Sequence, residues 1–286
     1  MTQLEASGET LPVEAFATLP GEPSQAHEVA FYSGGVLVLR GRLVRRCDLD
    51  GVALESRRLP DSKPQPAKMT VAGARVLVAA NQKWVVDWTR WQLIDSSPYF
   101  HAVISSSGQH WALRGLEPEQ GIAIWPVGDQ ERRYPPPVPA NATPLWVSDE
   151  RDLVFGTPAG VFRYSYQADE SQIVVASDGL AGGGAWHAAP DASTFVYTTS
   201  SQLRAFNARG QLTIHLKSMS GWTALAIASG GRIAAGTYKG RVFLLEGERK
   251  VDLTRTKDRI SSLAWSDDGS AVAWGAPFAF GVAKVS

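Results

Sequence analysis

The stretch "RISSLAWSDDGSAVAWG", residues 259–275, decides how the whole chain is interpreted. It consists of an apolar run, a tight polar turn that contains Asp and Gly, and a second apolar run. Two short apolar runs joined by such a turn are typical of two antiparallel strands. The same arrangement recurs upstream in weaker form, so this stretch is the clearest copy of a repeat rather than an isolated hairpin.

The repeat becomes visible when the last apolar residue before each turn is used as an anchor. Seven anchors fit this definition, and they are Phe31, Val71, Ile104, Val147, Ala188, Ile227 and Trp265. They are separated by 40, 33, 43, 41, 39 and 38 residues, with a mean of 39. Near-equal spacing at this length indicates a repeat architecture.

Each copy continues in the same way after its turn. A second apolar run is followed by a third, such as "GRVFLLE", and usually by a fourth, more polar run, such as "KVDLTR". No long stretch has the 3.6-residue apolar period of a helix. We therefore predict a single all-β domain over residues 1–286, a seven-bladed β-propeller with four antiparallel strands per blade. The blades are predicted to start near residues 28, 68, 101, 144, 184, 223 and 261.

The two ends of the chain complement each other in this scheme. The last copy ends after its third run, and the strand-like segment "PVEAFATL", residues 12–19, precedes the first copy without belonging to it. We predict that residues 12–19 supply the closing fourth strand of the last blade, because an unpaired edge would otherwise be exposed. Residues 1–11 are polar and are predicted to be frayed.

The turns carry a resemblance to a known family. The segments "LAWSDDGSAVAWG" and "HAAPDASTFVYTT" resemble the turns between the first and second strands of WD-repeat proteins. The resemblance covers about residues 28–286, without the Gly-His and Trp-Asp pairs of typical repeats. It implies a scaffold that binds other proteins and usually has no catalytic activity of its own.

Composition narrows the classes of partner. The chain has 28 basic and 28 acidic residues and a formal net charge of zero, which argues against nucleic acid or an anionic membrane as the main partner. Cys47 is the only cysteine, as expected in a reducing compartment. The N-terminal sequence has no secretory signal pattern. We therefore expect a cytoplasmic protein.

The sequence offers little that is typical of a catalytic or metal site. The five histidines are scattered, and none has the spacing of zinc ligands. The glycine-rich segment 177–186 lacks the Gly-Lys-Ser/Thr ending of a phosphate-binding loop and is interpreted as a connection between blades. The prolines of "RRYPPPVPAN", residues 132–141, indicate either a stiff connection or a ligand for a proline-reading module. We predict no catalytic residue, no cofactor and no metal.

The ten tryptophans and their aromatic neighbours suggest a partner surface instead. Four of them are predicted to pack between blades, namely Trp146, Trp186, Trp265 and Trp274. The predicted partner-binding residues lie in loops that lead into a blade or join its second and third strands: Trp222, Tyr238, Lys239, Arg259 and Phe278. The predicted function is a non-catalytic scaffold in a cytoplasmic multiprotein complex. The alternative is an enzyme or small-ligand binder with its site in the central funnel.

Overall fold

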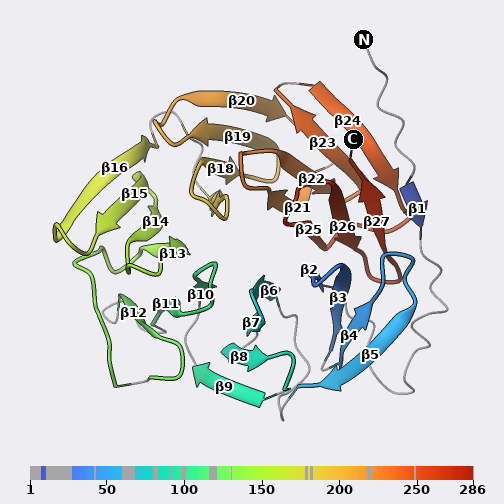
Figure 1. The fold of residues 1–286 in the computed structure, drawn as a ribbon. Coiled ribbons are helices and arrows are strands. Elements are labelled where there is room, and N and C mark those ends of the chain that lie inside the picture. The colour runs from blue at the N-terminus through green and yellow to red at the C-terminus, as the bar shows by residue number, and fades with distance from the viewer. Residues whose placement is uncertain are drawn as a thin grey trace. The chain divides into compact units, whose positions relative to one another are not determined.

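In the computed structural model, the regular structure of the described residues is entirely β. Over the described residues there are 27 strands in seven sheets, and each anchor of the sequence repeat lies in the first strand of one sheet (Figure 1). The structure describes residues 8–10, 28–41, 43–59, 68–79, 83–90, 92–97, 101–115, 121–129, 131–177, 180, 183–217, 221–247 and 249–285.

The chain divides into two compact units. The first unit comprises residues 1–67, 200–203 and 214–286, and the second comprises residues 68–199 and 204–213. The sheets are numbered here in the order of their first strands. Sheets 1, 6 and 7 belong to the first unit, and sheets 2, 3 and 4 belong to the second. Sheet 5 contributes residues to both units.

The three sheets of the first unit each have four strands. Sheet 1 has the order β2 (Glu28–Tyr32), β3 (Gly35–Arg40), β4 (Leu43–Cys47) and β5 (Ala53–Arg58). Sheet 6 has the order β21 (Trp222–Ile227), β22 (Ile233–Thr237), β23 (Arg241–Glu246) and β24 (Arg249–Arg255). Sheet 7 has the order β25 (Ser262–Trp265), β26 (Ala271–Gly275), β27 (Phe280–Lys284) and β1 (Gly8–Thr10).

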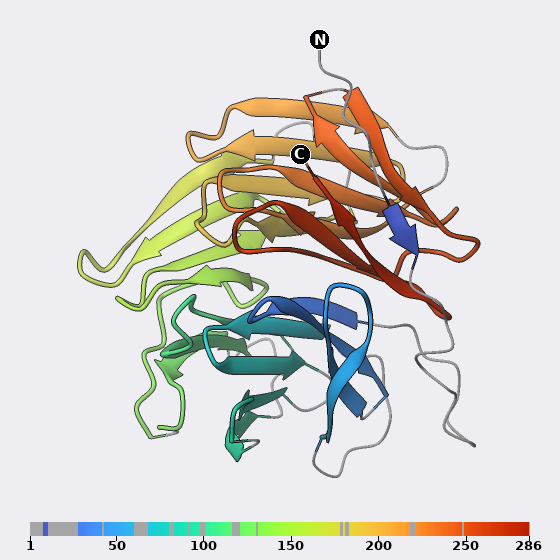
Figure 2. The same cartoon turned by 45° about the vertical axis from the view of Figure 1, so that its right-hand side comes forward.

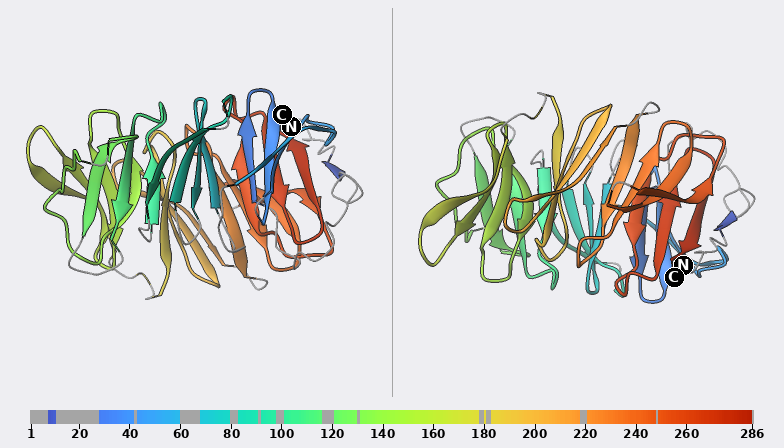
Figure 3. Two further views of the ribbon diagram at one scale, coloured as in Figure 1. Left: turned by 90° about the horizontal axis from the view of Figure 1, so that it is seen from below. Right: turned by 90° about the horizontal axis from the view of Figure 1, so that it is seen from above.

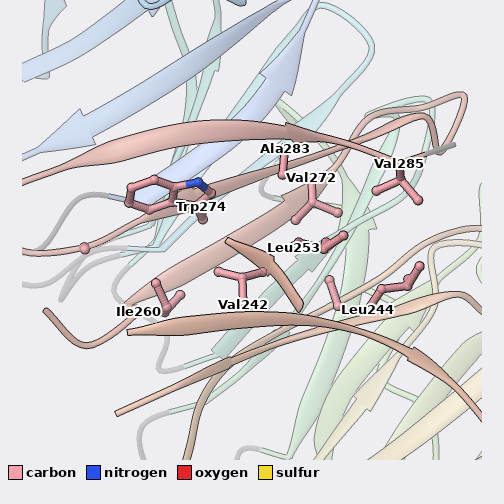
Figure 4. Close-up of a cluster of buried hydrophobic side chains, with 10 residues drawn as sticks. Val242, Leu244, Leu253, Ile260, Val272, Trp274, Ala283 and Val285 are labelled. Atoms are coloured by element: carbon pink, nitrogen blue, oxygen red, sulfur yellow. The ribbon is translucent and has the colours of Figure 1, made fainter. Parts of the chain in front are cut away.

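Sheets 6 and 7 share one apolar core. Val242 and Leu244 of β23 pack in the same cluster as Val272 and Trp274 of β26, and Trp274 is 1% exposed (Figure 4). Trp274 was predicted to pack between sheets, and the structure confirms this. Alternate residues of each strand enter the cluster, because side chains of a strand point to opposite faces in turn.

A glycine on the second strand of sheet 6 allows the connection to sheet 7 to come close. A Cβ added to Gly236 would lie 2.5 Å from Cγ2 of Ile260, the buried residue just before sheet 7. Gly156 of sheet 4 has the same role, since a Cβ there would lie 3.0 Å from the Trp186 side chain of sheet 5. The small residues that the sequence shows on second strands therefore mark places where neighbouring sheets approach one another.

Sheet 7 packs on sheet 1 through its other face. Val36, Val38 and the buried Cys47 of sheet 1 form a cluster with Ala273 and Phe280 of sheet 7. The backbone N–H of Val29 in β2 also donates a hydrogen bond to Ser262 Oγ at the start of β25, over 3.1 Å. Sheets 6, 7 and 1 are thus consecutive neighbours within the first unit.

The fourth strand of sheet 7 comes from the N-terminal region. β1 pairs antiparallel with β27, and Gly8, Glu9 and Thr10 lie opposite Ala283, Val282 and Gly281 (Figure 2). Residues 12–19, which were predicted to form this strand, lie outside the described residues, so their role stays a prediction. The pairing at residues 8–10 differs from the fraying expected for residues 1–11.

The second unit repeats the same plan. Sheet 2 has the order β6 (Lys68–Ala72), β7 (Arg75–Ala79), β8 (Lys83–Asp87) and β9 (Gln92–Ser97). Sheet 4 has the order β13 (Thr143–Val147), β14 (Leu153–Thr157), β15 (Gly160–Ser165) and β16 (Glu170–Ala176). Sheet 5 has the order β17 (Ala185–Ala188), β18 (Thr194–Thr198), β19 (Gln202–Asn207) and β20 (Leu212–Lys217).

Sheet 3 departs from the predicted four strands. It has only β10 (His101–Ile104), β11 (His110–Arg114) and β12 (Ile122–Pro126). In place of a fourth strand, Tyr134 forms a single antiparallel bridge to Ile124. Three prolines follow Tyr134, and a proline has no N–H with which to extend a ladder. The segment 132–141 is therefore a connection that touches the sheet at one residue.

The remaining tryptophans predicted to pack between sheets do so. The Trp146 indole N–H donates to the Pro190 carbonyl of the neighbouring sheet over 2.7 Å. Trp186 packs in one apolar cluster with Val154 and Val161 of sheet 4, and its ring lies 5.0 Å from the Tyr197 ring of its own sheet, measured between centroids. The Trp265 indole N–H donates to the Ala226 carbonyl of sheet 6 over 3.1 Å.

Candidate partner-binding site

The turn between β22 and β23 presents the most exposed large apolar side chain among the described residues. Tyr238 lies at the second position of this turn and is 64% exposed, and Lys239 follows it and is also exposed. The turn closes with a hydrogen bond from the Gly240 N–H to the Thr237 carbonyl, over 3.1 Å. Gly240 has a φ of 74°, a conformation that glycine adopts without steric cost.

The loop from sheet 6 to sheet 7, residues 256–260, is held against this turn by the backbone. The Thr256 N–H donates to the Gly240 carbonyl over 2.7 Å, and the Ile260 N–H donates to the Thr237 carbonyl over 3.2 Å. A Cβ at Gly240 would lie 2.4 Å from the Thr256 carbonyl oxygen. The exposed Arg259 is therefore fixed beside the turn that carries Lys239.

Phe278 lies in the equivalent turn of sheet 7 and is 49% exposed. Its turn closes with a hydrogen bond from the Ala276 N–H to the Ala279 carbonyl over 2.8 Å. The Ser261 N–H donates to the Gly275 carbonyl over 2.8 Å, so the loop that carries Arg259 also runs into this turn. Figure 3 shows the strands of these sheets side by side, with their turns gathered at two ends.

Trp222 behaves differently from the other four predicted residues. It is half-buried at the start of β21, and the Lys250 ammonium lies 5.0 Å from the centroid of its ring. The same ammonium donates to the Lys217 carbonyl over 2.9 Å, which holds it in place. The backbone still connects Trp222 to the site, because the Tyr238 N–H donates to the Gly221 carbonyl over 3.3 Å. Trp222 is thus a partly covered neighbour of the site.

The structure brings Tyr238, Lys239, Arg259 and Phe278 to one end of sheets 6 and 7. Two further cations there were not singled out from the sequence, Arg255 at the end of β24 and Lys257 in the loop. Both are exposed. The alternation of basic residues in "RTKDR", residues 255–259, was the signal that could have found them.

His187 and Cys47, one in each unit, have shifted pKa values, and burial is the main cause of both shifts. Burial and the positive charge of Lys68 lower the pKa of His187 to about 4, and the ring Nε2 lies 3.1 Å from Thr198 Oγ1. Burial raises the pKa of the Cys47 thiol to about 11, so this thiol is not a reactive nucleophile near neutral pH. Among the described residues, no three His, Cys, Asp or Glu side chains gather as metal ligands would.

Asp268, in the turn of the repeat copy at residues 259–275, forms its hydrogen bonds within that turn. Asp268 accepts hydrogen bonds from the Ser270 N–H over 2.9 Å and from the Ser266 and Ser270 hydroxyls. These bonds lower the pKa of Asp268 to about 2. Such Asp residues stabilise turns locally.

In the part of the chain that the structure covers, no helix has the length and apolarity that crossing a membrane requires.

Comparisons with known proteins support the fold and go no further. No protein-family model matches the chain, and no curated protein matches it either. Among solved structures, the β-propeller domain of Cps50 (Swd1) from Myceliophteria thermophila is similar to it, with a TM-score of 0.72 and 13% sequence identity. The match covers 99% of this chain and 100% of that one. At this identity the likeness concerns fold alone, and the chain is a seven-bladed, all-β propeller whose sheets have three or four strands.

Proposed function

We propose that the protein is a non-catalytic interaction scaffold that binds other proteins through the turn-bearing end of sheets 6 and 7. One observation carries this proposal: Tyr238 and Phe278 expose large aromatic side chains from turns that backbone hydrogen bonds hold in place. Exposed aromatic side chains beside charged groups are typical of interface residues. A rigid presentation lowers the entropy cost of association.

The resemblance to WD-repeat turns supports a role in binding other proteins, and the similarity to the Cps50 propeller supports the fold on which that role rests. A location in the cytoplasm is part of the same proposal. It is supported by the single, buried and free cysteine, which is compatible with a reducing compartment. The fold alone supports neither statement, since propellers host many functions.

The proposal is tested by affinity capture from the cells that produce the protein, followed by quantitative mass spectrometry. The test variant is Tyr238→Ala combined with Phe278→Ala. The matched control is Val52→Ala combined with Leu54→Ala, which removes two apolar side chains that are 60% and 56% exposed in the outer hairpin of sheet 1.

We expect the test variant to lose at least one partner that the wild type and the control both retain. A thermal melt of each variant shows whether the fold has survived. If the folded test variant retains every partner of the wild type, the proposed surface is wrong.

A further inference from the structure

The end of sheets 6 and 7 that carries Tyr238 is strongly basic. Residues 255–260 alternate in exposure: Arg255, Lys257 and Arg259 are exposed, and the residues between them are half-buried. The chain bends at Lys257 and Asp258, and the three exposed cations lie within five residues of one another. Lys239 adds a fourth cation from the adjoining turn. These four residues, Lys239, Arg255, Lys257 and Arg259, are called the basic edge below.

The basic edge is held in a fixed shape. Besides its backbone bonds to the turn at Gly240, the loop is braced by Thr256, whose hydroxyl donates to the Asp258 carbonyl over 3.1 Å. The same hydroxyl accepts a hydrogen bond from the Asp258 N–H over 2.9 Å. Ile260 anchors the end of the loop in the core, where it is fully buried. A ligand would therefore meet cations on an ordered backbone.

The positive charge of the basic edge is not neutralised within the described structure. None of its four cations has an ion pair with a described residue, whereas the nearby Arg241 is paired with Asp252. Asp258 is the one carboxylate within the loop and is half-buried. The carboxylates of Asp48, Asp50, Glu246, Asp267 and Asp268 lie at the opposite ends of the sheets. Glu28, at the start of β2 in sheet 1, lies at the same end as the basic edge, beside the bond from Val29 to Ser262.

Resting on the proposed function, we propose that the basic edge binds a carboxylate-rich segment of a partner protein, with Tyr238 receiving an apolar side chain of that segment. Three exposed cations within five residues, with Lys239 in the adjoining turn, favour a partner segment whose carboxylates lie close together in sequence, because complementary charges across an interface steer and specify association. The chain as a whole has no net charge, so the basic edge is a local feature rather than part of a general excess of positive charge. A short acidic segment fits such a patch better than a long nucleic acid, which needs basic contacts along its backbone.

The test uses fluorescence anisotropy with a labelled 12-residue probe peptide, in which Glu alternates with Ala around one central Leu. A second peptide has Gln in place of every Glu. A single-stranded oligonucleotide of equal charge serves as the third probe. We expect the Glu peptide to bind, the Gln peptide to bind at least about tenfold more weakly, and the oligonucleotide to bind more weakly than the Glu peptide.

The test variant is Lys257→Glu with Arg259→Glu, and the control is Arg249→Glu with Lys284→Glu. The control makes the same change in net charge with exposed residues at the opposite ends of sheets 6 and 7. We expect the test variant to lose at least about tenfold in affinity for the Glu peptide and the control to lose less than about twofold. Equal losses in both variants, no binding of the Glu peptide, or tighter binding of the oligonucleotide would each overturn the inference.

The same charge-reversal variant separates this inference from the proposed function. In affinity capture, a partner that is lost with Tyr238→Ala and Phe278→Ala but retained with Lys257→Glu and Arg259→Glu overturns the inference and leaves the scaffold proposal standing. Retention of every partner by both variants overturns the scaffold proposal itself.

Discussion

His187 is a half-buried base whose titration makes the stability of the fold depend on pH. Its pKa is lowered from 6.5 to about 4 by burial and by the charge of Lys68. As the pH falls below 6.5, the unfolded chain binds a proton at this position and the folded protein does not. The neutral ring therefore contributes its full stability above pH 6.5, and this contribution is lost progressively down to about pH 4.

Replacing His187 by Gln should remove this dependence and keep a polar partner for Thr198. Between pH 7 and pH 5, the free energy of unfolding of the wild type should fall by at most about 2 kcal/mol more than that of His187→Gln. Urea denaturation of both proteins at the two pH values measures the difference. If both lose the same stability, His187 is not the group that links folding to pH.

At the scale of the element, β1 gives sheet 7 a fourth strand through three paired residues. Removing residues 1–7 should leave the melting temperature unchanged, because β1 remains. Removing residues 1–11 should lower the free energy of unfolding by about 1–3 kcal/mol, since two or three ladder hydrogen bonds are lost. Thermal and urea unfolding of the two truncated proteins provide the comparison. Equal stabilities would show that the pairing of β1 contributes nothing.

A third truncation, without residues 1–20, tests the segment 12–19 that the sequence assigned to the same edge. If this segment also pairs or packs, the longer deletion destabilises the protein beyond the loss caused by removing residues 1–11. The segment has no role in closing the last sheet if the two deletions have the same stability.

Elements were predicted well where the signal was local and repeated. A turn between two apolar runs reports burial within a few residues, so Phe31, Ala188 and Trp265 located their strands correctly. The missing fourth strand of sheet 3 was not predicted, because the pattern of the other copies was extended to it. The three prolines after Tyr134 carried that information, since they cannot donate ladder hydrogen bonds.

At the scale of the whole molecule, the fold does not determine the function. As many as 1439 chains in solved structures match this one, so the propeller fold by itself does not choose a function. The site has to be argued from its own residues. The sequence correctly indicated exposure for Tyr238 and Phe278, because loops between strands lie at the surface. It indicated partial exposure for Trp222 but not that the Lys250 ammonium lies 5.0 Å from its ring centroid, because Lys250 comes from another strand of the sheet.

The measurement that tests the central claim most directly is hydrogen exchange, followed by mass spectrometry, on the protein alone and on the complex with a captured partner. The account predicts slower exchange on binding in residues 237–241, 256–260 and 276–279, which form the turn-bearing end of sheets 6 and 7. Protection confined to the opposite turns, such as residues 48–52 and 266–270, or to sheets of the second unit, would contradict it.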